Sequence, residues 1–105
     1  MTSTGRRSRI SIPRAAVEEL CRRNAIRTLS LFGSVLRDDF GPASDIDVLV
    51  EFMPGARVGL LGLARIQNEL ADLFGRAVDL LTPGSLPPRL RGDILQSAEP
   101  LFVAA

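Results

Sequence analysis

The sequence of 105 residues contains no histidine, tyrosine or tryptophan, and it has only one cysteine. It also contains no lysine, so all thirteen basic residues are arginines. These absences exclude a histidine base, a Schiff-base lysine and a P-loop lysine. The single cysteine, Cys21, excludes an internal disulfide and a cysteine-rich zinc site. Carboxylates, arginines and hydroxyls remain as catalytic groups, and carboxylates favour hard cations such as magnesium.

Long apolar runs and strong net charge are also missing. No apolar run approaches the roughly 18 residues of a membrane span, and the N-terminus lacks the apolar centre of a signal peptide. The net charge of +1 gives no strong field for nucleic acid, which is therefore not expected as a partner. We expect a cytoplasmic protein with one domain over residues 11–105, preceded by a flexible basic arm at residues 1–10.

Apolar periodicity predicts both helices and strands. Helices are expected at 13–24, at 60–74 and from 87 onward, and strands at 26–32, 46–52, 76–81 and 100–103. Cys21 is expected on a helix face as a small apolar residue, Leu60 opens the apolar stripe of the central helix, and the last helix is expected to direct Leu90, Ile94 and Leu95 inward. This order predicts an α/β (α+β) fold with two layers, in which helices pack on one face of a small mixed sheet.

The most informative pattern is Gly33-Ser34, followed after ten residues by Asp45 and Asp47. On a strand, residues spaced i, i+2 point to the same face, so both carboxylates lie side by side. Such a pair repels itself unless a cation lies between the two groups. Asp79, within the apolar run VDLL, is the best third ligand, because a lone aspartate there is costly without a cation or a donor. The three aspartates predict a site for two magnesium ions.

The residues before the aspartates fit a triphosphate. Glycine at position 33 permits close approach of the backbone, and Ser34 offers a hydroxyl and a backbone N–H at the start of a turn. Arg37 is placed to neutralise phosphate charge, although an ordinary surface arginine is the alternative. Ser44 is placed to cap or orient Asp45. These residues together predict a site for the triphosphate of a nucleotide.

Structural interpretations of the aspartates stay open. Asp45 can cap the start of a strand while Asp47 is simply solvated. Asp79 can pair with Arg76 or Arg91 instead of a metal, since structural ion pairs are common.

With these residues in view, the segment resembles the active-site signature of the DNA polymerase beta-like nucleotidyltransferase superfamily. Its small size is similar to that of the minimal nucleotidyltransferases, or MNT proteins. The similarity covers about residues 26–103 and includes FGS, SDIDVLVEF, VDLL and LPPRLRGDIL. It implies that Gly33 and Ser34 hold the triphosphate and that the three aspartates hold magnesium.

The resemblance also implies a function. MNT proteins commonly act as antitoxins beside a HEPN-domain RNase, and they transfer AMP from ATP to a tyrosine of that toxin. Because this chain has no tyrosine, the acceptor must lie on a partner. The turn departs from the family pattern at Val35 and Leu36, which leaves open a binding module that neutralises the toxin by occlusion alone. A nucleic-acid contact through Arg6, Arg7 and Arg9 is a third hypothesis.

Overall fold

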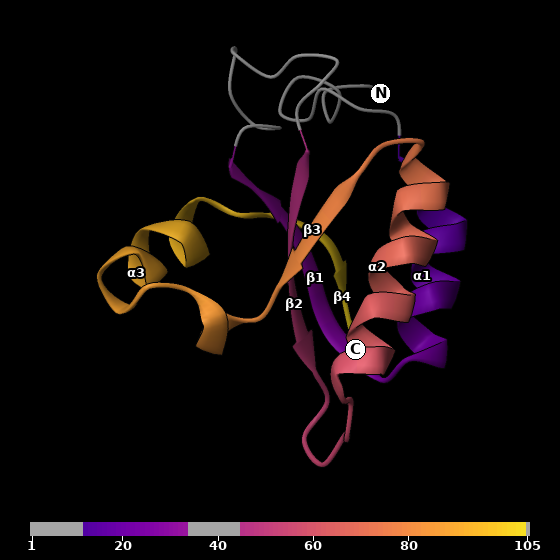
Figure 1. The fold of residues 1–105 in the computed structure, drawn as a ribbon, viewed down its shortest axis with the longest axis horizontal. Coiled ribbons are helices and arrows are strands. Elements are labelled where there is room, and N and C mark those ends of the chain that lie inside the picture. Colours follow the sequence, from indigo (N-terminus) through magenta and orange to yellow (C-terminus); the bar gives the residue numbers. More distant parts are fainter. Residues whose placement is uncertain (1–11, 34–44, 105) are drawn as a thin grey trace.

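The computed structural model describes residues 12–33 and 45–104. The predicted helices and strands are confirmed, with small shifts at their ends (Figure 1). The helices are α1 (Arg14–Arg23), α2 (Leu60–Phe74) and α3 (Pro88–Ser97), a 3-10 turn η3 covers Pro83–Ser85, and the strands are β1 (Ile26–Phe32), β2 (Ile46–Phe52), β3 (Val78–Leu81) and β4 (Glu99–Val103). The predicted arm at residues 1–10 lies outside the described residues.

The four described strands form one mixed sheet in the order β3-β2-β1-β4. β1 pairs antiparallel with both β2 and β4, whereas β2 and β3 run parallel. The parallel pair requires a crossover, and α2 supplies it. Both outer strands are short, and β4 contains Pro100, a residue tolerated at the edge of a sheet.

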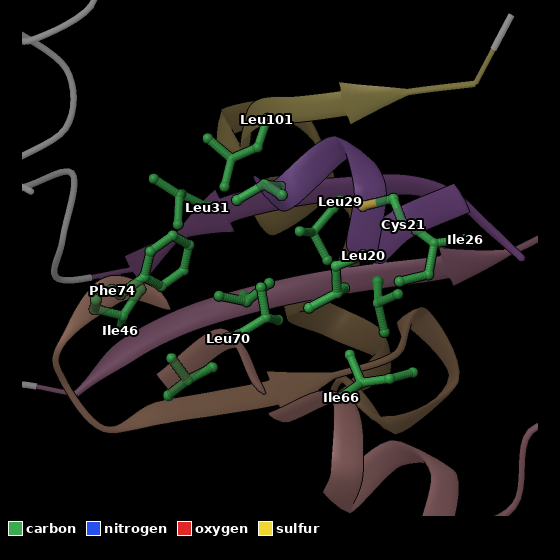
Figure 2. Packing of buried hydrophobic residues seen from close by; sticks show 14 residues of the cluster. Leu20, Cys21, Ile26, Leu29, Leu31, Ile46, Ile66, Leu70, Phe74 and Leu101 are labelled. Atoms are coloured by element: carbon green, nitrogen blue, oxygen red, sulfur yellow. The ribbon is translucent and has the colours of Figure 1, made fainter. Parts of the chain in front are cut away.

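The main core lies between the sheet and the pair α1 and α2 (Figure 1). Figure 2 shows Leu20 and Cys21 from α1 and Leu70 from α2 among the strand side chains. Ile46, Val48 and Val50 of β2 are completely buried, as their alternation in the sequence predicts. This packing fixes which side chains of each strand face away from α1 and α2.

The opposite face of the sheet is covered by α3 and η3, and Figure 1 shows α3 on the side away from α1 and α2. A second, smaller cluster joins Phe32 and Leu49 of the sheet to Leu86, with Ile94 of α3 packed against it. The predicted fold class is confirmed, but the placement of all helices on one face is wrong. The segment between β3 and α3 crosses to the other face, and Leu86 anchors it there.

Three of the leucines predicted to point inward are exposed instead. Leu60 at the start of α2 is 85% exposed, whereas Leu90 and Leu95 of α3 are each 44% exposed. Leu60 lies in the first turn of α2, before the helix reaches the core, where Ile66, Leu70 and Phe74 are buried. Ile94 alone of the three expected residues of α3 packs against a buried cluster.

Within the ranges that the structure describes, no helix combines the length and the apolar character needed to cross a membrane.

Candidate active site

Asp47 and Asp79 are direct neighbours in the sheet. In the parallel pairing of β2 with β3, Asp47 is the register partner of Asp79. Residues paired in this way project to the same face, and here this is the face of Leu49 and Leu81, which α3 and η3 cover. The backbone therefore places two of the three predicted carboxylates side by side on the side of the sheet that faces α3.

Asp45 precedes β2 by one residue and is exposed. The start of β2 is tied to the start of β3, because the Ile46 N–H donates a hydrogen bond of 2.9 Å to the Ala77 carbonyl. Asp45 therefore lies at the same end of the strand pair as the other two aspartates. Asp47 is half-buried and takes part in further interactions, whereas Asp79 is exposed on the short edge strand β3. Asp79 is therefore not buried, so the argument from the cost of burying it is wrong. Its register with Asp47 is the stronger argument for a shared site.

Gly33 meets the carboxylate of Asp47. It follows directly after Phe32, the register partner of Asp47 across β1 and β2. Its φ angle of +77° is one that residues with a side chain rarely adopt. A Cβ atom at this position would overlap Oδ2 of Asp47 and would lie 3.1 Å from its Cγ. Glycine is therefore needed here for two independent reasons, and the second one was not visible in the sequence.

A cavity of about 700 Å³ opens beside Gly33 and Asp47. Its lining combines the end of β1, Asp47 of β2 and one face of α3, namely Phe32, Gly33, Asp47, Leu90, Asp93, Ile94 and Ser97. The volume falls in the range of about 300–1,000 Å³ that is typical of small-molecule sites. The α3 residues were not predicted as site residues. Their i, i+3, i+4, i+7 spacing was the available signal for a shared face.

The donor set fits a hard divalent cation in its chemistry and in its backbone placement. Three carboxylates supply oxygen ligands of the kind that magnesium prefers, and two of them are register partners. In the structure, however, no three acidic or thiol side chains of the described residues gather around one point. The backbone brings the aspartates to one region, and their side chains do not form a closed cage there.

The pairing of Asp79 with Arg91, one of the structural interpretations of the aspartates, can be compared with the structure. None of the ion pairs of the described residues joins Asp79 to Arg91, whose Nη2 donates instead to the Leu86 carbonyl at 3.2 Å. Glu51 shares the parity of Asp47 along β2, but it accepts hydrogen bonds from Thr28 and Arg27 at 3.1 Å and 3.3 Å. Glu51 is therefore a structural residue near the far end of the strand. Ser34, Arg37 and Ser44 lie outside the described residues.

The chain is similar to known proteins in both sequence and fold. Residues 14–101 match the nucleotidyltransferase domain family. A Methanocaldococcus jannaschii protein, provisionally named a protein adenylyltransferase, is 41% identical over 76 residues, which are 72% of this chain and 80% of the relative. The protein adenylyltransferase MntA of Thermococcus cleftensis is 33% identical over 88 residues, which cover 82% of this chain and 85% of MntA.

Solved structures show the same fold. A structure described provisionally as a minimal nucleotidyltransferase is 40% identical, with a TM-score of 0.67 over 81% of this chain and 85% of that one. A toxin–antitoxin complex with AMP-PNP matches with a TM-score of 0.70 and 21% identity over 89% of this chain and 75% of its own. A further match, with a TM-score of 0.61 and 22% identity over 87% and 70% of the two chains, is a tri-AMPylated HEPN toxin of Shewanella oneidensis in complex with its MNT antitoxin. Given the extent of the family match and the identity to these relatives, the chain is a member of the nucleotidyltransferase domain family.

Proposed function

We propose that this protein is an antitoxin that transfers AMP from ATP to a tyrosine hydroxyl of a HEPN-type RNase toxin. The observation that carries the proposal is the register of Asp47 with Asp79, beside a glycine that leaves room for the Asp47 carboxylate. The names of the relatives support the same reaction class, because two of them are described as protein adenylyltransferases. A cytoplasmic location suits the single thiol, which stays reduced there.

In this proposal Asp45, Asp47 and Asp79 hold magnesium, with two ions as the expected number. Bound divalent ions would offset the negative charge that develops on the attacking and leaving oxygens of phosphoryl transfer. The chain itself supplies the carboxylate oxygens, which come from two adjacent strands held at a fixed spacing by the sheet.

The nucleotide is proposed to lie in the cavity beside these carboxylates. Gly33, which lines the cavity, and Ser34 would contact the triphosphate. Arg37 would offset phosphate charge, and Ser44 would orient Asp45. Each of these three polar residues follows from the sequence pattern and its resemblance to the family.

The acceptor is proposed to lie on a partner chain. This protein contains no tyrosine, so its own tyrosine cannot be modified. A relative of similar fold occurs in complex with a tri-AMPylated HEPN toxin. In-line displacement would require the toxin's tyrosine hydroxyl to approach the α-phosphate from the side opposite the leaving pyrophosphate.

The proposal is tested by incubating the protein with ATP labelled on the α-phosphate, magnesium and the HEPN-type toxin proposed as its partner. Asp47→Asn should reduce label on the toxin by at least about a thousandfold, since it removes a proposed ligand from the reacting centre. Asp72→Asn, an exposed aspartate on α2, is the matched control and should label normally. Full labelling by a folded Asp47→Asn variant would overturn the proposal.

The same pair of variants separates transfer from occlusion. If Asp47→Asn no longer labels the toxin and no longer neutralises its RNase activity, neutralisation depends on AMP transfer. If that variant still neutralises the toxin, the binding module described above is the better account.

A further inference from the structure

One face of α3 forms a wall of the cavity that Asp47 also lines. Leu90, Asp93, Ile94 and Ser97 all line the cavity, and they recur at the spacing of a single helix face. The sheet contributes Gly33 and Asp47 on the other side. A ligand in this cavity would therefore contact Gly33 and Asp47 on the sheet side and α3 on the other side.

The polar groups of this wall accept hydrogen bonds but offer almost none. Asp93 is exposed, and its carboxylate makes no ion pair or side-chain hydrogen bond with the described residues. The Ser97 hydroxyl already donates to the Asp93 carbonyl at 2.9 Å. An ionised carboxylate only accepts. The wall therefore suits a ligand that brings its own donors.

The charge of Asp93 decides which part of a nucleotide can lie against it. A triphosphate has no donor at neutral pH, and its negative charge repels a carboxylate. A ribose is neutral and carries two hydroxyl donors, and a carboxylate that accepts from ribose hydroxyls is a recurrent way to recognise a nucleoside. Leu90 and Ile94, on the same helix face, offer apolar surface to the flat parts of the ligand.

We propose that Asp93 is a ribose-binding residue, which accepts hydrogen bonds from the ribose hydroxyls of ATP and so favours ribonucleotides over deoxynucleotides. This inference rests on the proposed function, because it takes ATP to be the occupant of the cavity. It means that α3 would contribute to the selection of ribonucleotides as substrates. Hydrogen bonding of a substrate hydroxyl to a charged group also gives strong discrimination against analogues that lack it.

The test measures magnesium-dependent binding of ATP and of 2′,3′-dideoxyATP by calorimetry. The unmodified protein should bind ATP at least about tenfold more tightly than the dideoxy analogue. Asp93→Ala should weaken ATP binding by about tenfold and leave the affinity for the dideoxy analogue unchanged, so that the preference disappears. Asp93→Asn, which keeps one acceptor oxygen, should fall between the two. Asp72→Asn is again the control and should preserve the preference.

The outcomes distinguish this inference from the proposed function. If the unmodified protein binds both nucleotides equally, or if Asp93→Ala weakens both to the same extent, Asp93 does not bind the ribose, although ATP remains the substrate. If the unmodified protein binds neither nucleotide in the presence of magnesium, the proposed function and the role of Asp93 are both overturned. Because Asp93 is exposed on α3, urea unfolding should show equal stability for the variants and the parent.

Discussion

Gly33 joins local backbone geometry to the chemistry of the site. Its positive φ angle allows the chain to turn at the end of β1, and its missing side chain leaves space for the Asp47 carboxylate. The sequence predicted a glycine that admits phosphate. The structure adds that the same glycine admits a neighbouring protein side chain, so that its replacement should affect both stability and the site.

Gly33→Ala should lower the free energy of unfolding by about 2–4 kcal/mol, since it adds backbone strain to an overlap with Asp47. Gly75→Ala is the matched control. Gly75 ends α2 with a φ angle of +70°, but a Cβ atom there meets nothing within 4 Å. The control should therefore cost only the backbone strain, about 1 kcal/mol. Urea unfolding measures both values, and equal losses would show that the contact with Asp47 is unimportant.

At the scale of the element, α2 has an incomplete N-terminus. Gly59 is its N-cap residue, so no side chain caps the first turn, and that turn contains no acidic residue. The backbone at Gly59 is extended, and a Cβ atom there meets nothing within 4 Å. A side chain of the right kind can therefore be added without displacing a neighbour.

Gly59→Asp should raise the free energy of unfolding by about 0.5–1.5 kcal/mol, because it adds a capping acceptor and a charge that suits the helix dipole. Gly59→Ala restricts the unfolded chain without capping the helix and serves as the control. Thermal unfolding should rank Asp above Ala. If Ala matches Asp, capping contributes nothing and only the unfolded chain has changed.

The residue ranges of the helices and strands were largely predictable from the sequence. Which face of the sheet each helix covers was not. The alternation in β2 and the stripe of α2 gave the correct residue ranges, because burial imposes those periods on the sequence. Periodicity does not say which layer covers a face. For that reason α3 was assigned to the wrong face, and Leu60 was assigned to the core.

The candidate site divides in the same way. Asp45, Asp47 and Asp79 were proposed from their spacing and from the run VDLL, whereas the register of Asp47 with Asp79 needed the structure. Asp93 lines the cavity because of the path of the chain after β3, which the sequence pattern does not reveal. Residue spacing along one helix could not place that helix opposite Asp47.

At the scale of the whole molecule, one buried thiol should control the response to alkaline pH. Burial, aided by the charge of Glu18 and opposed by Arg22, raises the pKa of Cys21 from 9.0 to about 12. The chain has no lysine, tyrosine or histidine, so no other side chain titrates between these values. In that range the unfolded chain binds fewer protons than the folded chain, so stability is full below about pH 9 and falls as pH rises.

The expected slope is at most about 1.4 kcal/mol of unfolding free energy per pH unit between pH 9 and 12. Urea unfolding at several pH values measures it. Cys21→Ala should remove the slope, whatever its own cost to packing. A parallel decline in both proteins would show that Cys21 is not the group responsible.

The two outer strands of the sheet determine how readily another strand could pair with its edges. A free strand edge offers unpaired N–H and C=O groups to which the edge of another molecule can add. Here β3 is only four residues long, and Pro100 removes one donor from the five-residue β4. An open sheet of this kind is thus poorly suited to edge-to-edge stacking of copies.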